Sequence, residues 1–396
     1  MIEKLVEDYS GTYSVRVLNT VEDLEWIRSF WSKFAWHYFA DIDFYLTIIN
    51  SRTEILMPYI IVLCKNGLPE TIVVGRIEEV KVICNFGYKT VYSPKARFLS
   101  IVYGGVMGNQ CPANMDIIVS EILSSLRFGI VDLVQFSLIR LDSDLYRLAK
   151  SRAGFFFSDH VTPPTAHWKI VLPANHDSFM KTVSQKHRYW LRRLQKLLEK
   201  EHEGQIVFKF FVDTEQVNIF CEDVEKVAKT TYQRGLGVGF LNTAETRKRL
   251  ELSAEKKWFR GYVLYAGDEP IAYWSATLFG KVLYLDGTGY NPNYRKYEPG
   301  TILFIKLIEL AYKENDRIQE IDFGFGGAFY KERYGNQNWQ ESDVYIFSRT
   351  LKGLKINFIR SIILILHRLA EHVSRQTNLI QIIKKHWRKR FIPSNN

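Results

Sequence analysis

Apolar residues in the first 165 positions follow helical periods in some segments and strand periods in others, which predicts a mixed α and β region. Glu22–Tyr38 has the spacing of a helix, whereas the β-branched runs Pro58–Cys64 and Thr71–Gly75 predict strands. Lys65-Asn66-Gly67 between these two runs is typical of a hairpin turn. A further strand is predicted at Val131–Ile139, after a segment with a helical period.

The proline-bearing stretch 162–165 precedes a change of pattern, and we expect a domain boundary there. Beyond it, Asn175–Lys200 has the period of one amphipathic helix with a leucine-rich apolar side. Basic residues spaced by seven, four and four predict a stripe along that helix, formed by Lys181, Arg188, Arg192 and Lys196. Such a stripe is either a solvated helix face or a site for an anion such as a sugar phosphate, a lipid pyrophosphate or tRNA.

The segment 281–335 has the order strand, helix, strand. Val282–Leu285 is an apolar strand, a helix is expected from Pro299 to Tyr312, and Ile318–Phe323 is a second strand. Short connections make this a βαβ unit, so the two strands should be parallel with a right-handed crossover. Asp286 and Asp322 lie at the carboxyl ends of these strands, where the working cleft of such units is found.

Several motifs lie in and around this unit. They are Tyr-Leu-Asp-Gly-Thr-Gly-Tyr at 284–290, Tyr294-x-x-Tyr297-x-Pro299-Gly300-Thr301, Asp322-Phe323-Gly324-Phe325-Gly326, Tyr330-Lys331-x-x-Tyr334-Gly335 and Ser184-Gln185-Lys186-His187-Arg188. Together they resemble the acyltransferases of the GNAT superfamily. More narrowly, they are similar to the CelD-like branch, which is related to FemAB-type transferases and is often associated with bacterial polysaccharide biosynthesis. The resemblance covers roughly residues 166–350.

The resemblance implies an α+β protein with tandem GNAT-like domains, the first degenerate (1–165) and the second an acyltransferase (166–350). It implies acyl transfer from acyl-CoA, a co-substrate with no permanently bound cofactor, to the amine of an amino sugar or envelope-polysaccharide precursor. One alternative is FemAB-type transfer from aminoacyl-tRNA, the only reading in which nucleic acid would be a partner. Another is a catalytically silent, membrane-associated subunit of a polysaccharide assembly.

Acyl transfer from a thioester needs a site for the donor's phosphates, and a helix N-terminus supplies amide groups and a positive dipole end. The turn at 295–301 enters the helix of the βαβ unit, and Gly300 would let a phosphate approach the backbone. The expected donor-binding residues are Arg295, Tyr297, Gly300 and Thr301. The alternative is an ordinary helix start with Pro299 at its first position.

Glu298 departs from the GNAT pattern, because those enzymes usually have glycine at this point of the turn. A carboxylate there would repel a pyrophosphate at close range. Either this side chain turns away, or the donor is not coenzyme A.

The residues after the second strand carry the expected catalytic groups. By resemblance, Tyr330 is the general acid for the departing thiolate, and its reference pKa of about 10 keeps it protonated. Lys331 is expected to neutralise a phosphate or an oxyanion, and Asp322 or Asp286 to accept the amine's proton. Asp286, Arg188 and Arg192 are the candidates for binding the acceptor. In the alternative interpretation Tyr330 and Lys331 anchor the loop, and the aspartates cap glycine turns.

The net charge of +10 is concentrated at the C-terminus. Residues 351–396 contain ten basic residues and one acid, which gives +9, so the first 350 residues carry +1. The balanced body argues against a general nucleic-acid binder. The tail alternates aliphatic stretches with basic clusters, which predicts a basic amphipathic helix. Such a helix either docks on the anionic inner face of the membrane or packs on the domain with a solvated basic end.

Several features that would assign the chain to another class of protein are missing from the sequence. The nine histidines lack the spacings of metal ligands, so we expect no metal site. The four cysteines contain no C-x-x-C pair, and a reduced, cytoplasmic setting fits them best. A secretory signal is not expected from the first residues, and no apolar run approaches the length of a membrane-spanning helix.

Overall fold

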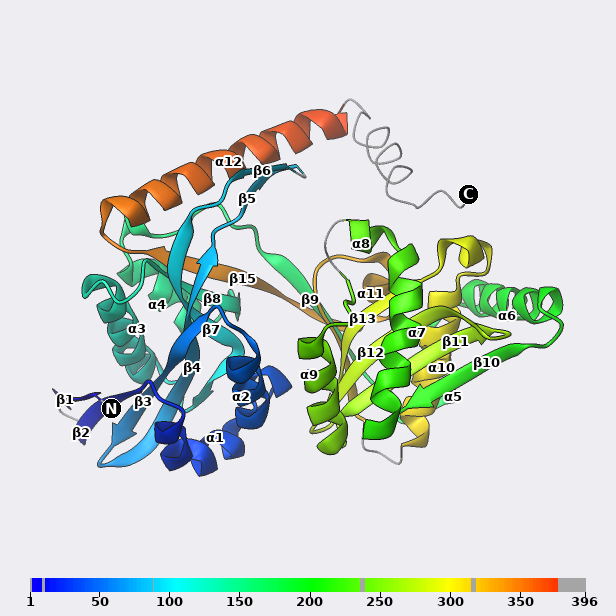
Figure 1. Cartoon of the computed structure of the whole chain (residues 1–396), viewed down its shortest axis with the longest axis horizontal. Coiled ribbons are helices and arrows are strands. Elements are labelled where there is room, and N and C mark those ends of the chain that lie inside the picture. Colours follow the sequence, from blue (N-terminus) through cyan, green and yellow to red (C-terminus); the bar gives the residue numbers. More distant parts are fainter. Residues whose placement is uncertain (1, 9–10, 88, 236–238, 315–317, 377–396) are drawn as a thin grey trace. The chain divides into compact units, whose positions relative to one another are not determined.

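The computed structural model of the chain describes residues 2–8, 11–87, 89–235, 239–314 and 318–376 (Figure 1). The chain forms two compact units. The first unit contains the chain up to Thr165 and, from Gln340 onward, the end of strand β15 and helix α12 (Leu351–Gln376). The second unit is Ala166–Trp339. None of the helices in the described ranges is long and apolar enough to cross a membrane.

The sheet of the first unit contains one parallel pair among antiparallel neighbours. Its strands, in spatial order, are β1 (Ile2–Asp8), β2 (Gly11–Leu18), β3 (Ile55–Lys65), β4 (Leu68–Lys81), β7 (Lys95–Gly108), β8 (Leu133–Arg140) and β15 (Gln337–Phe347). The parallel pair is β7 with β8, and the predicted hairpin joins β3 to β4, with left-handed backbone at Asn66 and Gly67. A separate hairpin is formed by β5 (Cys84–Phe86) and β6 (Lys89–Tyr92).

Helix α3 (Pro112–Arg127) connects the parallel strands β7 and β8, and its buried Ile118 and Ile122 share a core with Val134 of β8. The other helices of this unit are α1 (Arg28–Phe34), α2 (Ile42–Ser51) and α4 (Asp144–Arg152), with 3-10 turns at Glu22–Ile27, Tyr38–Ala40 and Phe155–Phe157. The helix predicted over Glu22–Tyr38 is therefore shorter than expected. It ends at Phe34 because Ala35 takes an extended backbone.

The second unit repeats this arrangement. Its strands, in spatial order, are β9 (Thr165–Val171), β14 (Glu320–Phe325), β13 (Val282–Tyr290), β12 (Glu269–Phe279), β11 (Phe259–Ala266) and β10 (Ile206–Phe211). Here β13 and β14 are the parallel pair, and helix α10 (Pro299–Lys313) connects them. The remaining helices are α5 (His176–Thr182), α6 (Gln185–Glu201), α7 (Val217–Thr230), α8 (Tyr232–Gly235), α9 (Ala244–Glu255) and α11 (Phe329–Tyr334), with 3-10 turns at Thr214–Gln216 and Pro292–Tyr297.

Helices α10 and α7 cover opposite faces of the second sheet. Leu303 and Leu307 of α10 share a core with Trp274 of β12. Val224 of α7 shares a different core with Tyr273, the preceding residue of the same strand. Neighbouring residues of a strand point to opposite faces, so the two cores lie on the two sides of the sheet.

In each unit, one strand of the sheet follows in the sequence after elements of the other unit. Strand β9 follows α4 of the first unit in the sequence but pairs with β14, and β15 follows α11 of the second unit but pairs with β8. Both pairings are antiparallel. In each of them the partner strand, β14 or β8, is the second strand of its unit's parallel pair. The predicted α+β class is confirmed, with a parallel pair and a crossover helix in each unit.

The prediction of a single helix over Asn175–Lys200 is wrong, because two helices occupy this segment. Val183 has an extended backbone, and the Ser184 hydroxyl accepts a hydrogen bond from the backbone N–H of His187, 3.3 Å away, which starts α6. Lys181 therefore lies on α5, and the predicted stripe keeps its other three members on α6. The sequence-based division at residue 350 stays a prediction, and the described part of the tail belongs to helix α12 of the first unit.

Candidate functional site

The parallel strands β13 and β14 pair over three residues and then part. Their register runs from Val282 opposite Glu320 to Tyr284 opposite Asp322. Beyond this point β14 continues to pair with β9, while β13 continues along β12 with a bulge at Asp286. The expected parallel orientation and divergence are therefore present. We refer to the region around Tyr284 and Asp322, where the two strands separate, as the strand divergence.

The N-terminus of α10 is held at the sheet by a tryptophan. The indole N–H of Trp274 donates a hydrogen bond to the Gly300 carbonyl oxygen at 3.2 Å. A Cβ added at Gly300 would have Tyr290 as its nearest neighbour, at an ordinary 3.7 Å. Glu298 precedes the helix with a left-handed backbone (φ 49°), and its exposed carboxylate accepts a hydrogen bond from the Thr301 hydroxyl at 3.4 Å. The turn thus carries a negative charge at the positive end of the helix.

The predicted donor-binding residues separate into two groups. Arg295 is exposed on the 3-10 turn before α10, and Gly300 and Thr301 begin the helix. Tyr297 is 4% exposed, and its hydroxyl donates to the Glu201 carboxylate at the end of α6. Its side chain therefore connects α6 to the turn.

Tyr330 lies in the first turn of α11, directly after the glycine-rich loop that follows β14. Its ring contacts Trp274 and Phe323 with centroid distances of 5.7 Å and 5.6 Å. Burial raises the pKa of Tyr330 to about 12, so the hydroxyl stays protonated throughout the physiological range. Because Trp274 also bonds to Gly300, the tyrosine and the α10 N-terminus lie on the same face of the sheet.

The buried Lys331 side chain binds the backbone of the glycine-rich loop that follows β14. It is 8% exposed, and its ammonium donates to the carbonyl oxygens of Phe325 (2.7 Å) and Gly324 (3.3 Å). Burial lowers the pKa of Lys331 to about 8, partly offset by the charge of Asp322. Gly324 and Gly326 have positive φ, so the loop needs glycine at both positions.

Asp322 is buried at the end of the parallel ladder, and the same carboxylate oxygen accepts two hydrogen bonds. These come from the Nε2 of His167 at 2.7 Å and from the backbone N–H of Gly324 at 2.6 Å. The His167 ring is 2% exposed and stacks on Trp339, with centroids 4.4 Å apart. Asp322 therefore caps the glycine turn and fixes His167, a residue that the sequence pattern did not indicate.

Asp286 is the exposed acid of the site. Its carboxylate accepts a hydrogen bond from the Thr277 hydroxyl at 2.7 Å. Along β12, Thr277 points to the same face of the sheet as Tyr273 and to the opposite face from Trp274. Helix α7 covers the face that carries Tyr273. Asp286 therefore faces the α7 side, whereas Tyr330 and the α10 N-terminus lie on the α10 side.

The two predicted acceptor-binding arginines lie on α6. The Arg188 guanidinium donates to the Met180 carbonyl oxygen of α5 at 2.9 Å, and Arg192 is exposed. The described contacts of Arg188 are thus with α5 and not with β13 or β14.

His187 links α6 to α11, which sequence analysis also missed. Its Nε2 lies 2.8 Å from the Tyr334 hydroxyl, and its ring stacks on Trp190. Burial and the nearby Arg333 charge lower the pKa of His187. This contact supports the short helix that carries Tyr330.

Within the described ranges, no group of three or more histidine, cysteine, aspartate or glutamate side chains is placed to hold a metal ion.

Residues 185–332 match the family model described as "Acetyltransferase (GNAT) domain". The matched segment lies within the second unit and is similar to GNAT acetyltransferase domains. The chain is accordingly an acyltransferase, and GNAT domains use acyl-CoA as a co-substrate. The match covers the strand divergence, the α10 N-terminus and the start of α11 with Tyr330 and Lys331, and it leaves the CelD-like branch open.

Solved structures resemble the chain in fold at low sequence identity. FemX superposes with a TM-score of 0.51 at 10% identity, covering 76% of this chain and 90% of FemX. A conserved protein of unknown function from Bacteroides thetaiotaomicron gives 0.49 at 10% identity, over 84% of this chain and all of that one. A tandem GNAT protein from the clavulanic acid biosynthesis pathway gives 0.46 at 9% identity, over 85% and 99%. No curated protein matches the sequence.

Proposed function

We propose that the second unit transfers an acyl group, acetyl in keeping with the matched acetyltransferase model, from acyl-CoA to the amine of an amino sugar or an envelope-polysaccharide precursor, as in the CelD-like branch. The supporting observation is the connection of Tyr330, Trp274 and Gly300, which joins a protonated hydroxyl to a helix N-terminus beside the strand divergence. Residues 1–165 would then be the degenerate GNAT-like partner domain.

In this proposal the donor lies on the α10 side. The N-terminus of α10 receives the phosphates, with Arg295 as an exposed counter-charge. Glu298 opposes this binding, so its carboxylate would have to turn toward solvent, which its exposure and flexible side chain allow.

The acceptor approaches from the Asp286 side of the strand divergence. The amine nitrogen attacks the thioester carbonyl carbon, the carbon–sulfur bond breaks, and the thiolate takes the proton of the Tyr330 hydroxyl. The proton of the amine passes to Asp286 directly or through water. Lys331 and Asp322 act as positioning residues, because their described contacts hold the glycine-rich loop before Tyr330.

The acceptor's own anionic group is assigned to α6. Arg192 is exposed there, and Arg188 lies one turn before it. A sugar phosphate or lipid pyrophosphate would suit these guanidinium groups. An acceptor of this kind would place the enzyme in the cytoplasm, at the inner face of the membrane.

One observation favours a second candidate, the FemAB-type transfer of an aminoacyl group from tRNA. Glu298 places a carboxylate at the helix end where pyrophosphate would bind, and an aminoacyl-tRNA donor does not require pyrophosphate there. Exposed basic residues on α6 would then meet the RNA backbone. The domain match favours either enzyme over a silent subunit.

Calorimetry with acetyl-CoA, followed by thiol release in the presence of candidate amino sugars, tests the proposal. Binding with turnover is the expected result. If acetyl-CoA does not bind and tRNA binds with strong salt dependence, the second candidate replaces the first. If neither ligand binds, both are wrong.

A further inference from the structure

Within the part of the chain that the structure describes, helix α12 carries large apolar side chains that are exposed on its outer face. Although the helix belongs to the first unit, six of its large apolar side chains are exposed by 40% or more. They are Leu351, Phe358, Ile362, Ile365, Leu366 and Leu369. The most exposed, Leu351, is 88% accessible. Exposed apolar groups of this size on one helix indicate a binding surface.

These side chains lie along one line of the helix. From Leu351 the spacing is seven to Phe358, four to Ile362, three to Ile365 and four to Leu369. Steps of three, four and seven return to the same side of an α-helix. We call this line the outer stripe. Ile356 and Ile363 lie on another side and are buried with Phe98 and Leu133 in the core of the first unit.

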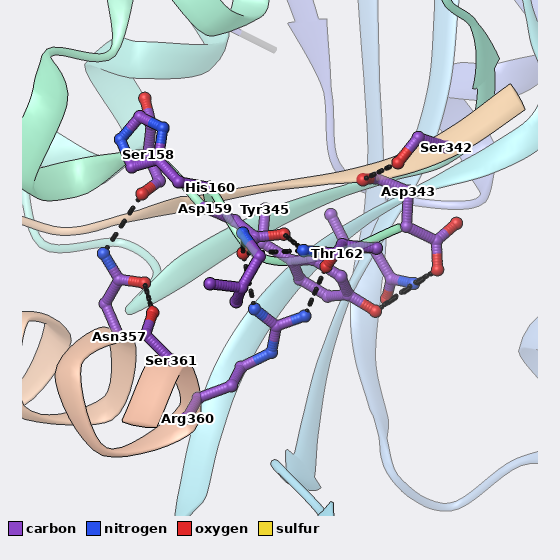
Figure 2. Close-up of polar contacts among 12 residues, drawn as sticks. Ser158, Asp159, His160, Thr162, Ser342, Asp343, Tyr345, Asn357, Arg360 and Ser361 are labelled. Carbon is purple, nitrogen blue, oxygen red and sulfur yellow. Dashed lines mark hydrogen bonds and ion pairs between the residues drawn. The ribbon is translucent and has the colours of Figure 1, made fainter. Parts of the chain in front are cut away.

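Polar contacts fix the orientation of α12, as Figure 2 shows. The Arg360 guanidinium donates to the buried Asp159 carboxylate at 2.9 Å and to the Thr162 hydroxyl at 2.6 Å. The Asn357 amide donates to the carbonyl oxygens of Phe156 and Ser158. Rotating the outer stripe inward would leave Asp159 buried without its partner, which is strongly unfavourable. The stripe therefore stays outside.

The positive charge around the outer stripe favours an anionic partner. Residues 351–396 carry +9, and the last twenty contribute five basic residues, no acid and Trp387. Two copies of so basic a segment would repel each other, whereas an anionic surface would attract it. Exposed basic groups at Lys355 and Arg368 lie beside the apolar residues within the helix itself.

We propose that α12 lies on an anionic lipid surface, with the outer stripe inserted among the headgroups and acyl chains. The combination of one apolar helix face with flanking lysine and arginine residues is the composition of helices that bind in the plane of a membrane interface. The proposal concerns the first unit and stands independently of the donor and acceptor of the second.

Co-sedimentation of the full chain with phosphatidylcholine vesicles, with and without about 30% phosphatidylglycerol, tests it. The wild type is expected to bind the anionic vesicles and to be released by salt. The variant Phe358→Ser/Ile362→Ser/Ile365→Ser is expected to bind at least about tenfold more weakly. A matched control, Leu68→Ser/Phe128→Ser/Ile219→Ser, removes three apolar side chains elsewhere that are each more than half exposed, and it should bind like the wild type.

Three outcomes would overturn the proposal: no binding of the wild type to anionic vesicles, equal binding of the outer-stripe variant, or a wild-type dimer that this variant dissociates without any vesicle binding. The single variant Leu369→Glu provides a second readout if the triple variant unfolds. Turnover of a soluble amine without vesicles should be the same in wild type and variants. Its absence in all of them would contradict the proposed function and leave lipid binding intact.

Discussion

The Nε2 of His167 and the carboxylate of Asp322 lie 2.7 Å apart, on neighbouring antiparallel strands at the end of the parallel ladder. Both side chains are buried, and the same Asp322 oxygen also accepts the Gly324 backbone N–H. This pair couples the core of the second unit to the loop that leads to Tyr330. These two hydrogen bonds give Asp322 a structural role in the second unit.

Replacing the two aspartates should therefore affect stability to different extents. Asp322→Ala leaves His167 and the Gly324 amide without their acceptor in the core, so we expect a loss of about 2–3 kcal/mol in the free energy of unfolding. Asp286→Ala, at an exposed position, removes only the acceptor of the Thr277 hydroxyl and should cost less, about 1 kcal/mol. Urea unfolding measures both. If Asp286→Ala keeps full turnover of a candidate amine, Asp286 has no part in the proton transfer.

Removing the Tyr330 hydroxyl should affect the chemical step. Tyr330→Phe keeps the ring between Trp274 and Phe323 but deletes the proton donor, so we expect kcat to fall about 100-fold with little change in donor KM. Steady-state thiol release measures both constants. Tyr312→Phe is the control, because that hydroxyl donates to the Pro173 carbonyl oxygen instead. Equal kinetics of wild type and Tyr330→Phe would remove Tyr330 from the mechanism.

Neutralising Glu298 should distinguish the two donors. If acyl-CoA phosphates bind at the α10 N-terminus, Glu298→Gln should tighten acetyl-CoA binding roughly threefold to tenfold, because a like charge is removed. Glu298→Gly should do the same and add about 1 kcal/mol of stability, since the backbone there is left-handed.

Calorimetry and thermal unfolding check these two effects, with the exposed Glu255→Gln as the control. Unchanged acetyl-CoA affinity in both Glu298 variants would show that the donor does not meet this end of the helix.

The buried ammonium of Lys331 predicts a stability change at alkaline pH. The folded pKa of about 8 lies below the ordinary value of 10.5, so the unfolded chain binds more protons between these two values. Stability is therefore reduced below about pH 8 and recovers as pH rises from 8 toward 10.5. Relative to Lys331→Met, the wild type should gain roughly 1–2 kcal/mol over this interval, because solvent screening reduces the full effect.

Denaturant unfolding at several pH values measures this difference. Lys200→Met removes an exposed lysine and should give no such change. If the difference in unfolding free energy between the wild type and Lys331→Met does not change with pH, burial does not lower the pKa of Lys331.

Local patterns were sufficient for the elements around the site. The apolar runs and the Pro299-Gly300 start predicted two parallel strands and their crossover helix, because strand and helix periods are local properties of a sequence. The same reasoning joined Asn175–Lys200 into one helix, since the break depends on a single capping hydroxyl at Ser184. Local patterns also could not show that the Tyr297 hydroxyl binds Glu201 of α6, because the two residues are 96 positions apart in the sequence.

The sequence by itself determined the α+β class, the order of the elements in the second unit and the residues that follow its parallel strands. Only the tertiary structure decided which of these residues are buried and which are exposed. It buried Asp322 against His167 and Lys331 against two carbonyl oxygens, and it left Asp286 exposed. These roles depend on contacts between strands that are distant in the chain, and side-chain spacing along one strand carries no information about them.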